Sequence, residues 1–118
     1  MLKKVSHAIF LMQKIKLLQH TYKLTDPVEI ALMNRIALYQ AHDENIAVSN
    51  VIKWKDLGSA ATLHGRLLRL LKRKLVQFDK SDEDARIRFV KLSETSSQYY
   101  GAIGEAMANP TKKLPSTN

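Results

Sequence analysis

One face of a predicted helix in the second half of the chain carries side chains suited to binding nucleic acid. On a helical wheel with about 100° per residue, three arginines fall within about 40° of Thr62, namely Arg66, Arg69 and Arg73. Leucines at positions 63, 67, 70 and 71 occupy the other side and are predicted to pack on the preceding helix. The major groove of B-form DNA admits a helix, and arginine can bind the edge of guanine through two hydrogen bonds. Residues 59–73 are therefore predicted to be a recognition helix, with its arginine face presented to DNA.

The positive charge of the chain is concentrated around this helix. The 118 residues carry a formal net charge of +8, and residues 53–74 hold seven Lys and Arg against one acid, Asp56. Residues 59–74 contain no acid, whereas a solvated helix usually mixes acids among its bases in pairs four residues apart. A nucleic acid is therefore favoured as the partner of this face over a solvated basic surface or an acidic protein.

The first half of the predicted recognition helix is built from small residues. Ser59 is predicted to cap the helix and, as a secondary role, to contact DNA, because small residues let the backbone approach a groove. Gly65 is unusual in mid-helix, where it costs about 1 kcal/mol relative to alanine; close approach of DNA or of another helix would explain it. His64 lies at the border of the apolar arc, where a packed or edge histidine is favoured over a base contact.

An alternating apolar and polar pattern follows this helix. Residues 75–80 and 86–92 are predicted to form two strands joined by the acidic loop 81–85, so that 76–92 is a hairpin wing. Three basic residues flank the loop and are predicted DNA contacts: Lys80, Arg86 and Arg88. In this interpretation Asp84 orients Arg86, and the basic side chains reach the DNA backbone or minor groove. The alternative is a solvated turn without a partner.

Further helices are predicted on both sides of this region. Residues 2–22 have an apolar stripe at helical spacing, formed by Val5, Ile9, Leu11, Met12, Ile15 and Leu18. A second helix should run from Pro27 to about Ala41, with Asp26 as its cap and Glu29 completing a capping box. A very short strand is predicted at 46–48, then a third helix that Ser49 caps and that ends near Asp56.

The order of elements predicts the fold class. A last helix opens at Ser93 and Glu94, with an inward stripe of Tyr99, Tyr100, Ile103 and Met107. The chain is predicted to be mainly α with a small β-hairpin, a winged helix-turn-helix domain flanked by N- and C-terminal helices. Its parts are expected to be a dimerisation helix at 1–24, the DNA-binding domain at 25–93, a helix at 94–109 and a flexible tail at 110–118.

Several classes of protein are disfavoured by what the sequence lacks. There is no cysteine, which excludes disulfides, thiolate metal sites and cysteine nucleophiles. The four histidines lie far apart, and the best metal candidate, His42-Asp43-Glu44, is better explained as an exposed loop. No catalytic residues, metal or cofactor are predicted, and the chain is expected not to be an enzyme. The longest apolar run, 8–12, is too short to span a membrane, so a soluble cytoplasmic protein is expected, with the first helix buried in a dimer rather than on a membrane.

Residues 47–107 resemble the multiple-antibiotic-resistance regulator (MarR) type of winged-helix transcription factor. The segments that carry the resemblance are Gly58–His64 at the turn and helix start, Leu75-Val76 at the wing entry, Asp84-Ala85-Arg86 at the wing tip, and Arg88–Glu94. Lys74 and Ser96 depart from the pattern, because glycine is usual at both positions. The resemblance implies a dimeric transcriptional regulator that binds double-stranded DNA and often releases it on binding a small-molecule effector. It also implies that Ser59, Thr62 and Arg66 lie at base edges, Arg86 in the minor groove, and the first and last helices at the dimer interface.

Two other functions remain open for a winged-helix chain. Some winged-helix proteins bind other proteins rather than DNA, and others are replication initiators that bind DNA. DNA binding should weaken steeply with salt, and replacement of Arg66 or Arg69 by alanine is expected to weaken it.

Overall fold

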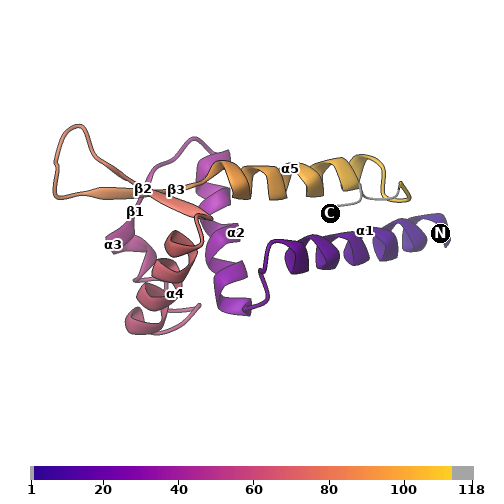
Figure 1. Cartoon of the computed structure of the whole chain (residues 1–118), viewed down its shortest axis with the longest axis horizontal. Helices are drawn as coiled ribbons and strands as arrows, with labels where there is room; N and C mark the ends of the chain where they lie inside the picture. The colour runs from indigo at the N-terminus through magenta and orange to yellow at the C-terminus, as the bar shows by residue number, and fades with distance from the viewer. Residues whose placement is uncertain (1, 113–118) are drawn as a thin grey trace. The chain divides into compact units, whose positions relative to one another are not determined.

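The chain folds into two compact units. The computed structural model describes residues 2–112 (Figure 1). The central unit is Thr25–Ser97, and the terminal unit combines the residues up to Leu24 with those from Gln98 onward. The described helices are α1 (Leu2–Thr21), α2 (Pro27–Ala41), α3 (Val48–Val51), α4 (Ala60–Lys72) and α5 (Glu94–Ala108). The strands are β1 (Ile46–Ala47), β2 (Val76–Lys80) and β3 (Arg88–Leu92).

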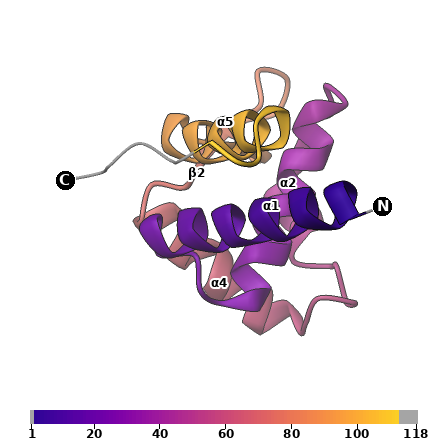
Figure 2. The ribbon, with the colours of Figure 1, turned by 90° about the vertical axis from the view of Figure 1, so that its right-hand side faces the viewer.

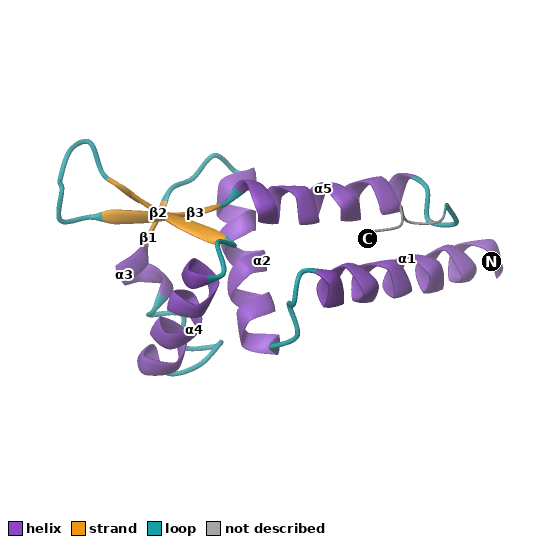
Figure 3. Ribbon diagram, viewed as in Figure 1, coloured by secondary structure: helices purple, strands orange, loops and turns teal. Residues whose placement is uncertain are grey.

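A small antiparallel sheet lies at one side of the helices of the central unit (Figure 3). Its strand order is β1-β3-β2, with Ile46 opposite Val90 and Phe78 opposite the same Val90 from the other side. The β2–β3 hairpin and its loop extend beyond α3 and α4 as a wing (Figure 1). The predicted class, mainly α with a β-hairpin in a winged helix-turn-helix arrangement, is confirmed, and β1 adds a third strand.

The core of the central unit lies under one face of α4. Three leucines of that helix, Leu63, Leu67 and Leu70, are fully buried, and α4 packs against α2. The buried residues of α2 on the other side of this contact include Leu32, Met33 and Ile36. Burial of a leucine side chain stabilises by about 2 kcal/mol, so this contact holds the two helices together.

Local capping signals explain where two of the helices begin. The Asp26 carboxylate accepts hydrogen bonds from the Val28 and Glu29 backbone N–H groups, and Ser59 Oγ accepts one from the Thr62 N–H at 3.1 Å. The prediction that Ser49 caps the third helix is wrong, because α3 begins at Val48, has Ala47 at its cap position and ends at Val51. A run of turns replaces its expected second half, up to Ser59.

The terminal unit contains α1 and most of α5 (Figure 2). Tyr22 and Tyr99 meet edge to face with ring centroids 5.4 Å apart. The buried Lys14 donates a hydrogen bond from Nζ to the Asn109 carbonyl at 3.0 Å, next to the end of α5. No described helix is long and apolar enough to cross a membrane.

The predicted apolar stripe of α1 is largely exposed among the described residues. Val5, Ile9 and Met12 of that stripe are exposed, the last to 69%, whereas Leu18 on the neighbouring face is buried. Met107 of α5 is exposed as well, and Ala106 is buried in its place. Helical spacing identifies an apolar face, but it does not indicate whether residues of the same chain or of a partner bury that face.

Lys74 adopts a backbone conformation that favours glycine. The Leu75 N–H donates to the Leu70 carbonyl and the Lys74 N–H to the Leu71 carbonyl, which together form a Schellman motif at the end of α4. This motif needs a left-handed residue, and Lys74 supplies it with φ of 61°. A side chain with a Cβ atom is strained there, which explains why glycine would be usual at this position.

Replacing Lys74 by glycine is therefore expected to raise the free energy of unfolding by about 0.5–1 kcal/mol. The Lys74→Ala variant is the matched control, because it removes the same charge but keeps the Cβ atom, and its stability should stay near that of the parent. Chemical denaturation monitored by circular dichroism measures both. Equal stability of the two variants would show that the left-handed conformation carries no strain.

Candidate nucleic-acid interface

The outward face of α4 lies opposite its buried leucines. The residues that reach solvent along it are Ala61, His64, Gly65, Leu68 and Lys72. A Cβ atom added at Gly65 would meet no other atom within 4 Å, so the backbone is open to solvent at this point. No helix of the described chain covers Gly65, so close packing against another helix of the chain does not explain this mid-helix glycine.

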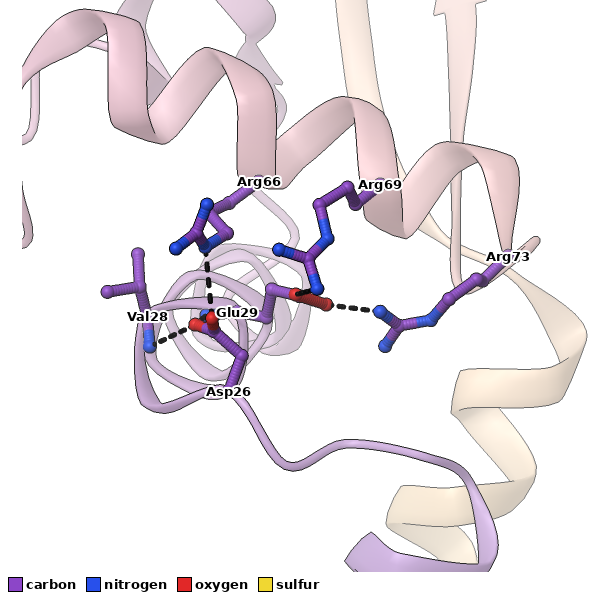
Figure 4. A network of polar contacts seen from close by, with 6 residues as sticks. All are labelled: Asp26, Val28, Glu29, Arg66, Arg69 and Arg73. Carbon is purple, nitrogen blue, oxygen red and sulfur yellow. Dashed lines mark hydrogen bonds and ion pairs between the residues drawn. The ribbon is translucent and has the colours of Figure 1, made fainter.

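The predicted arginine face is not the outward face. Arg66, Arg69 and Arg73 lie along the flank of α4 that faces the start of α2 (Figure 4). Arg66 Nε donates to Asp26 Oδ2 at 3.0 Å, and Arg73 Nη1 donates to Glu29 Oε1 at 2.5 Å. Arg69 Nη2 lies 3.2 Å from Glu29 Oε2. We call these five residues the α2–α4 clamp.

The clamp corrects the inference drawn from the absence of acids in residues 59–74. The acidic partners come from α2, about 40 residues earlier in the chain, and only the fold brings them to the arginines. Glu29 does not complete the predicted capping box, since its carboxylate turns to Arg69 and Arg73 instead of back to the Asp26 N–H. Whether the arginines also contact DNA stays a prediction.

Glu29 is the most buried charge of the clamp. Its side chain is 1% exposed, and two guanidinium groups offset the desolvation of its carboxylate. Glu29 also sits in the first turn of α2, where the N-terminal end of the helix dipole stabilises a negative charge. Its Oε1 accepts a hydrogen bond, whereas its buried Oε2 accepts none from the described residues.

Asp26 combines a helix cap with an ion pair. Desolvation is the largest single effect on its carboxyl and opposes ionisation, but the Glu29 N–H and the Arg66 charge outweigh it, so the pKa of Asp26 is lowered. A lowered folded-state pKa means that this contribution to stability is fully present above a pH of about 4 and is lost as the pH falls through the lowered value.

The wing carries the remaining predicted basic contacts. Asp84 accepts hydrogen bonds from Arg86 Nε at 3.1 Å and Arg86 Nη2 at 3.0 Å, as the sequence predicted for its orienting role. This contact lowers the pKa of Asp84. Arg86 remains 90% exposed at the tip of the loop. Lys80 and Arg88 are exposed partners in the last register pair of the hairpin, so two like charges lie directly opposite each other.

The predicted site residues thus fall into separate groups. Gly65 lies on the outward face, whereas the hydroxyls of Ser59 and Thr62 are 2.9 Å apart and engaged in capping α4. The sequence interpretation passed over Leu68 and Lys72, and placed His64 at an apolar border although it is exposed. Centring the wheel on the leucines at 63, 67 and 70 would have found this outward line. In the described part of the chain, no group of three His, Asp or Glu residues could hold a metal ion.

Known structures share this fold. No family model and no curated protein matches the sequence. The S. aureus MepR–DNA complex is similar with a TM-score of 0.64 and 14% identity over 92% of this chain and 78% of that chain. The transcriptional regulator Tm0710 from Thermotoga maritima gives 0.65 and 12% identity over 92% and 70%, and MarR gives 0.54 and 14% over 89% and 69%. The chain therefore has the winged-helix fold of MarR-type regulators. The small-molecule effector that the sequence resemblance implies stays a prediction.

Replacing Glu29 by glutamine is expected to lower the free energy of unfolding by about 2 kcal/mol, because two guanidinium groups lose their buried counter-charge. The loss is less than for a fully buried pair, since both arginines reach solvent in part. Denaturant unfolding measures the change. Glu105→Gln, at an exposed site on α5, is the control and should be neutral. Equal stability of the two variants would show that the clamp does not stabilise the fold.

Proposed function

We propose that this chain is a transcriptional regulator that binds double-stranded DNA, with the outward face of α4 in the major groove and the β2–β3 hairpin as a wing. The observation that carries the proposal is the uncovered backbone at Gly65, in the middle of a helix whose exposed line also holds Ala61, His64, Leu68 and Lys72. Small residues let a helix approach base edges closely. The likeness to a protein–DNA complex of the same fold supports this assignment.

Charge on the outward face favours an anion as partner. Lys72 lies on the same line as Gly65, and Lys74 follows directly at the end of α4. Neither forms an ion pair with the described residues, in contrast to Arg66 in the clamp. Lysines in this position can neutralise DNA phosphates on either side of a groove.

The basic residues of the wing also favour DNA as the partner. Lys80 and Arg88 are exposed cross-strand neighbours, and like charges in direct register destabilise a hairpin unless an anion lies between or beside them. A phosphate of the DNA backbone would supply that anion. The Arg86 side chain is 90% exposed and is held by Asp84 in one orientation, which suits insertion into a minor groove.

We also propose that the chain acts as a homodimer through α1. Several apolar residues along this helix are exposed: Leu2, Val5, Ile9, Phe10, Met12 and Leu17. A contiguous apolar surface of this kind marks a protein–protein contact, and a second copy of the chain offers the same surface. A two-fold dimer would place two α4 helices on a symmetric operator.

For DNA binding, fluorescence anisotropy with a labelled random-sequence duplex is expected to show affinity that falls steeply with salt. Gly65→Leu should weaken binding about tenfold or more, because its side chain would occupy the space that the groove must enter. Gly65→Ala is the matched control for folding. Both variants should be more stable than the parent, by about 1 kcal/mol for alanine. A duplex affinity that Gly65→Leu leaves unchanged would place the DNA elsewhere or favour a protein partner.

For assembly, sedimentation equilibrium at about micromolar concentration is expected to give twice the chain mass. A charge introduced at the exposed Ile9, as Ile9→Glu, should shift the mass to that of one chain and weaken binding to duplex DNA, because one of two half-site contacts is lost. Gln77→Glu is the matched control, because it introduces the same charge at an exposed site on β2, and this variant should remain dimeric. A parent chain that sediments as a monomer would remove the symmetric-operator proposal.

A further inference from the structure

The clamp contains more positive than negative charge. Three arginines face two carboxylates, so one positive charge is in excess. Asp26 is matched by Arg66 alone, whereas Glu29 is shared by Arg69 and Arg73. The excess charge therefore belongs to the pair around Glu29.

The two arginines around Glu29 are not equivalent. Arg73 donates a hydrogen bond to Glu29 Oε1, and its side chain is 30% exposed. Arg69 lies near Oε2 without a hydrogen bond to it, and its side chain is 53% exposed. On the helix, Arg69 lies between the clamp and the outward line of Gly65 and Lys72. Arg69 can therefore turn away from Glu29 at less cost than Arg73 can.

We propose that Arg69 binds a phosphate of the DNA backbone by leaving Glu29, while Arg73 stays and keeps the buried carboxylate neutralised. This inference rests on the proposed function. It assigns different roles to the three arginines that were predicted to contact DNA. Arg69 is a phosphate-binding residue, whereas Arg66 and Arg73 are positioning residues that hold α4 on α2. Glu29 keeps a counter-charge in both states, so the exchange leaves no unpaired buried charge.

The exchange has a chemical consequence for recognition. A guanidinium group binds two phosphate oxygens at once, which a carboxylate shared with Arg73 does not offer to Arg69. A phosphate contact adds affinity and fixes the position of the helix but does not read the base sequence. Loss of Arg69 should therefore weaken binding to every duplex by a similar factor.

The test is the salt dependence of duplex binding for the full chain and four variants. From about 50 to about 200 mM salt, one phosphate contact accounts for roughly a threefold loss of affinity, a slope of about 0.9 in log Kd against log salt. Arg69→Ala should lower the slope by about that amount and keep the unfolding midpoint of the parent, whereas Arg69→Lys should keep most of the slope. Arg73→Ala should lower the unfolding midpoint and, measured below it, keep the slope.

Arg35→Ala is the control for removal of one charge, because Arg35 pairs with Asp56 through two hydrogen bonds outside the clamp and should leave the slope unchanged. A parental slope retained by Arg69→Ala would overturn the assignment of Arg69 and leave the DNA-binding proposal intact. Equal reductions in Arg69→Ala and Arg35→Ala would also overturn it, because they would report net charge alone. Absence of duplex binding by the parent chain would instead refute the proposed function itself.

Discussion

The placement of α4 depends on a carboxylate at the start of α2. Glu29 is almost completely removed from water, and a buried carboxylate is strongly unfavourable unless cations and hydrogen bonds compensate it. Two arginines of α4 provide the cations, and the first turn of α2 provides a favourable dipole. The carboxylate can therefore be buried only when α4 lies with this flank against α2. Apolar packing of the leucines is non-directional, whereas the clamp selects one rotation of α4 about its axis.

That rotation decides which side chains can meet a partner. The leucines at 63, 67 and 70 point into the core, the clamp takes the neighbouring flank, and Gly65 and Lys72 are left outward. A rotation of about 100°, the angle between successive residues, would bring the arginines outward and move the buried leucines onto the flank that faces α2. The outward surface of α4, where DNA is proposed to bind, is thus narrower and less charged than the composition of α4 suggests. In the proposed complex, affinity for DNA would come from the lysines at the edges of this surface, from the wing and from the partly exposed Arg69.

The sequence predicted what depends on neighbours along the chain. Three kinds of feature were predicted correctly: the caps at Asp26 and Ser59, the alternating strands of the wing, and the contact between Asp84 and Arg86. In each of them, the residues that form the pattern or the contact lie close together in the sequence. The partners of the arginines could not be found this way, because Glu29 precedes Arg73 by 44 residues. The outward line of α4 can be predicted from the sequence when the helical wheel is centred on the leucines at 63, 67 and 70 rather than on Thr62. The exposed stripe of α1 shows the same limit, since periodicity identifies an apolar face and not what covers it.

Asp43 of the central unit has a positive φ at the end of α2, and three further positions that oppose local preferences lie on or next to the proposed interface. Gly65 weakens the middle of α4, Lys74 holds a left-handed backbone, and Lys80 faces Arg88 across the hairpin. None of these choices stabilises the folded chain by itself, and each costs up to about 1 kcal/mol. Sequences usually agree with their fold at every level except where function requires otherwise. A polyanion that approaches the backbone at Gly65 and meets positive charge at the other two positions gives all three departures one physical reason.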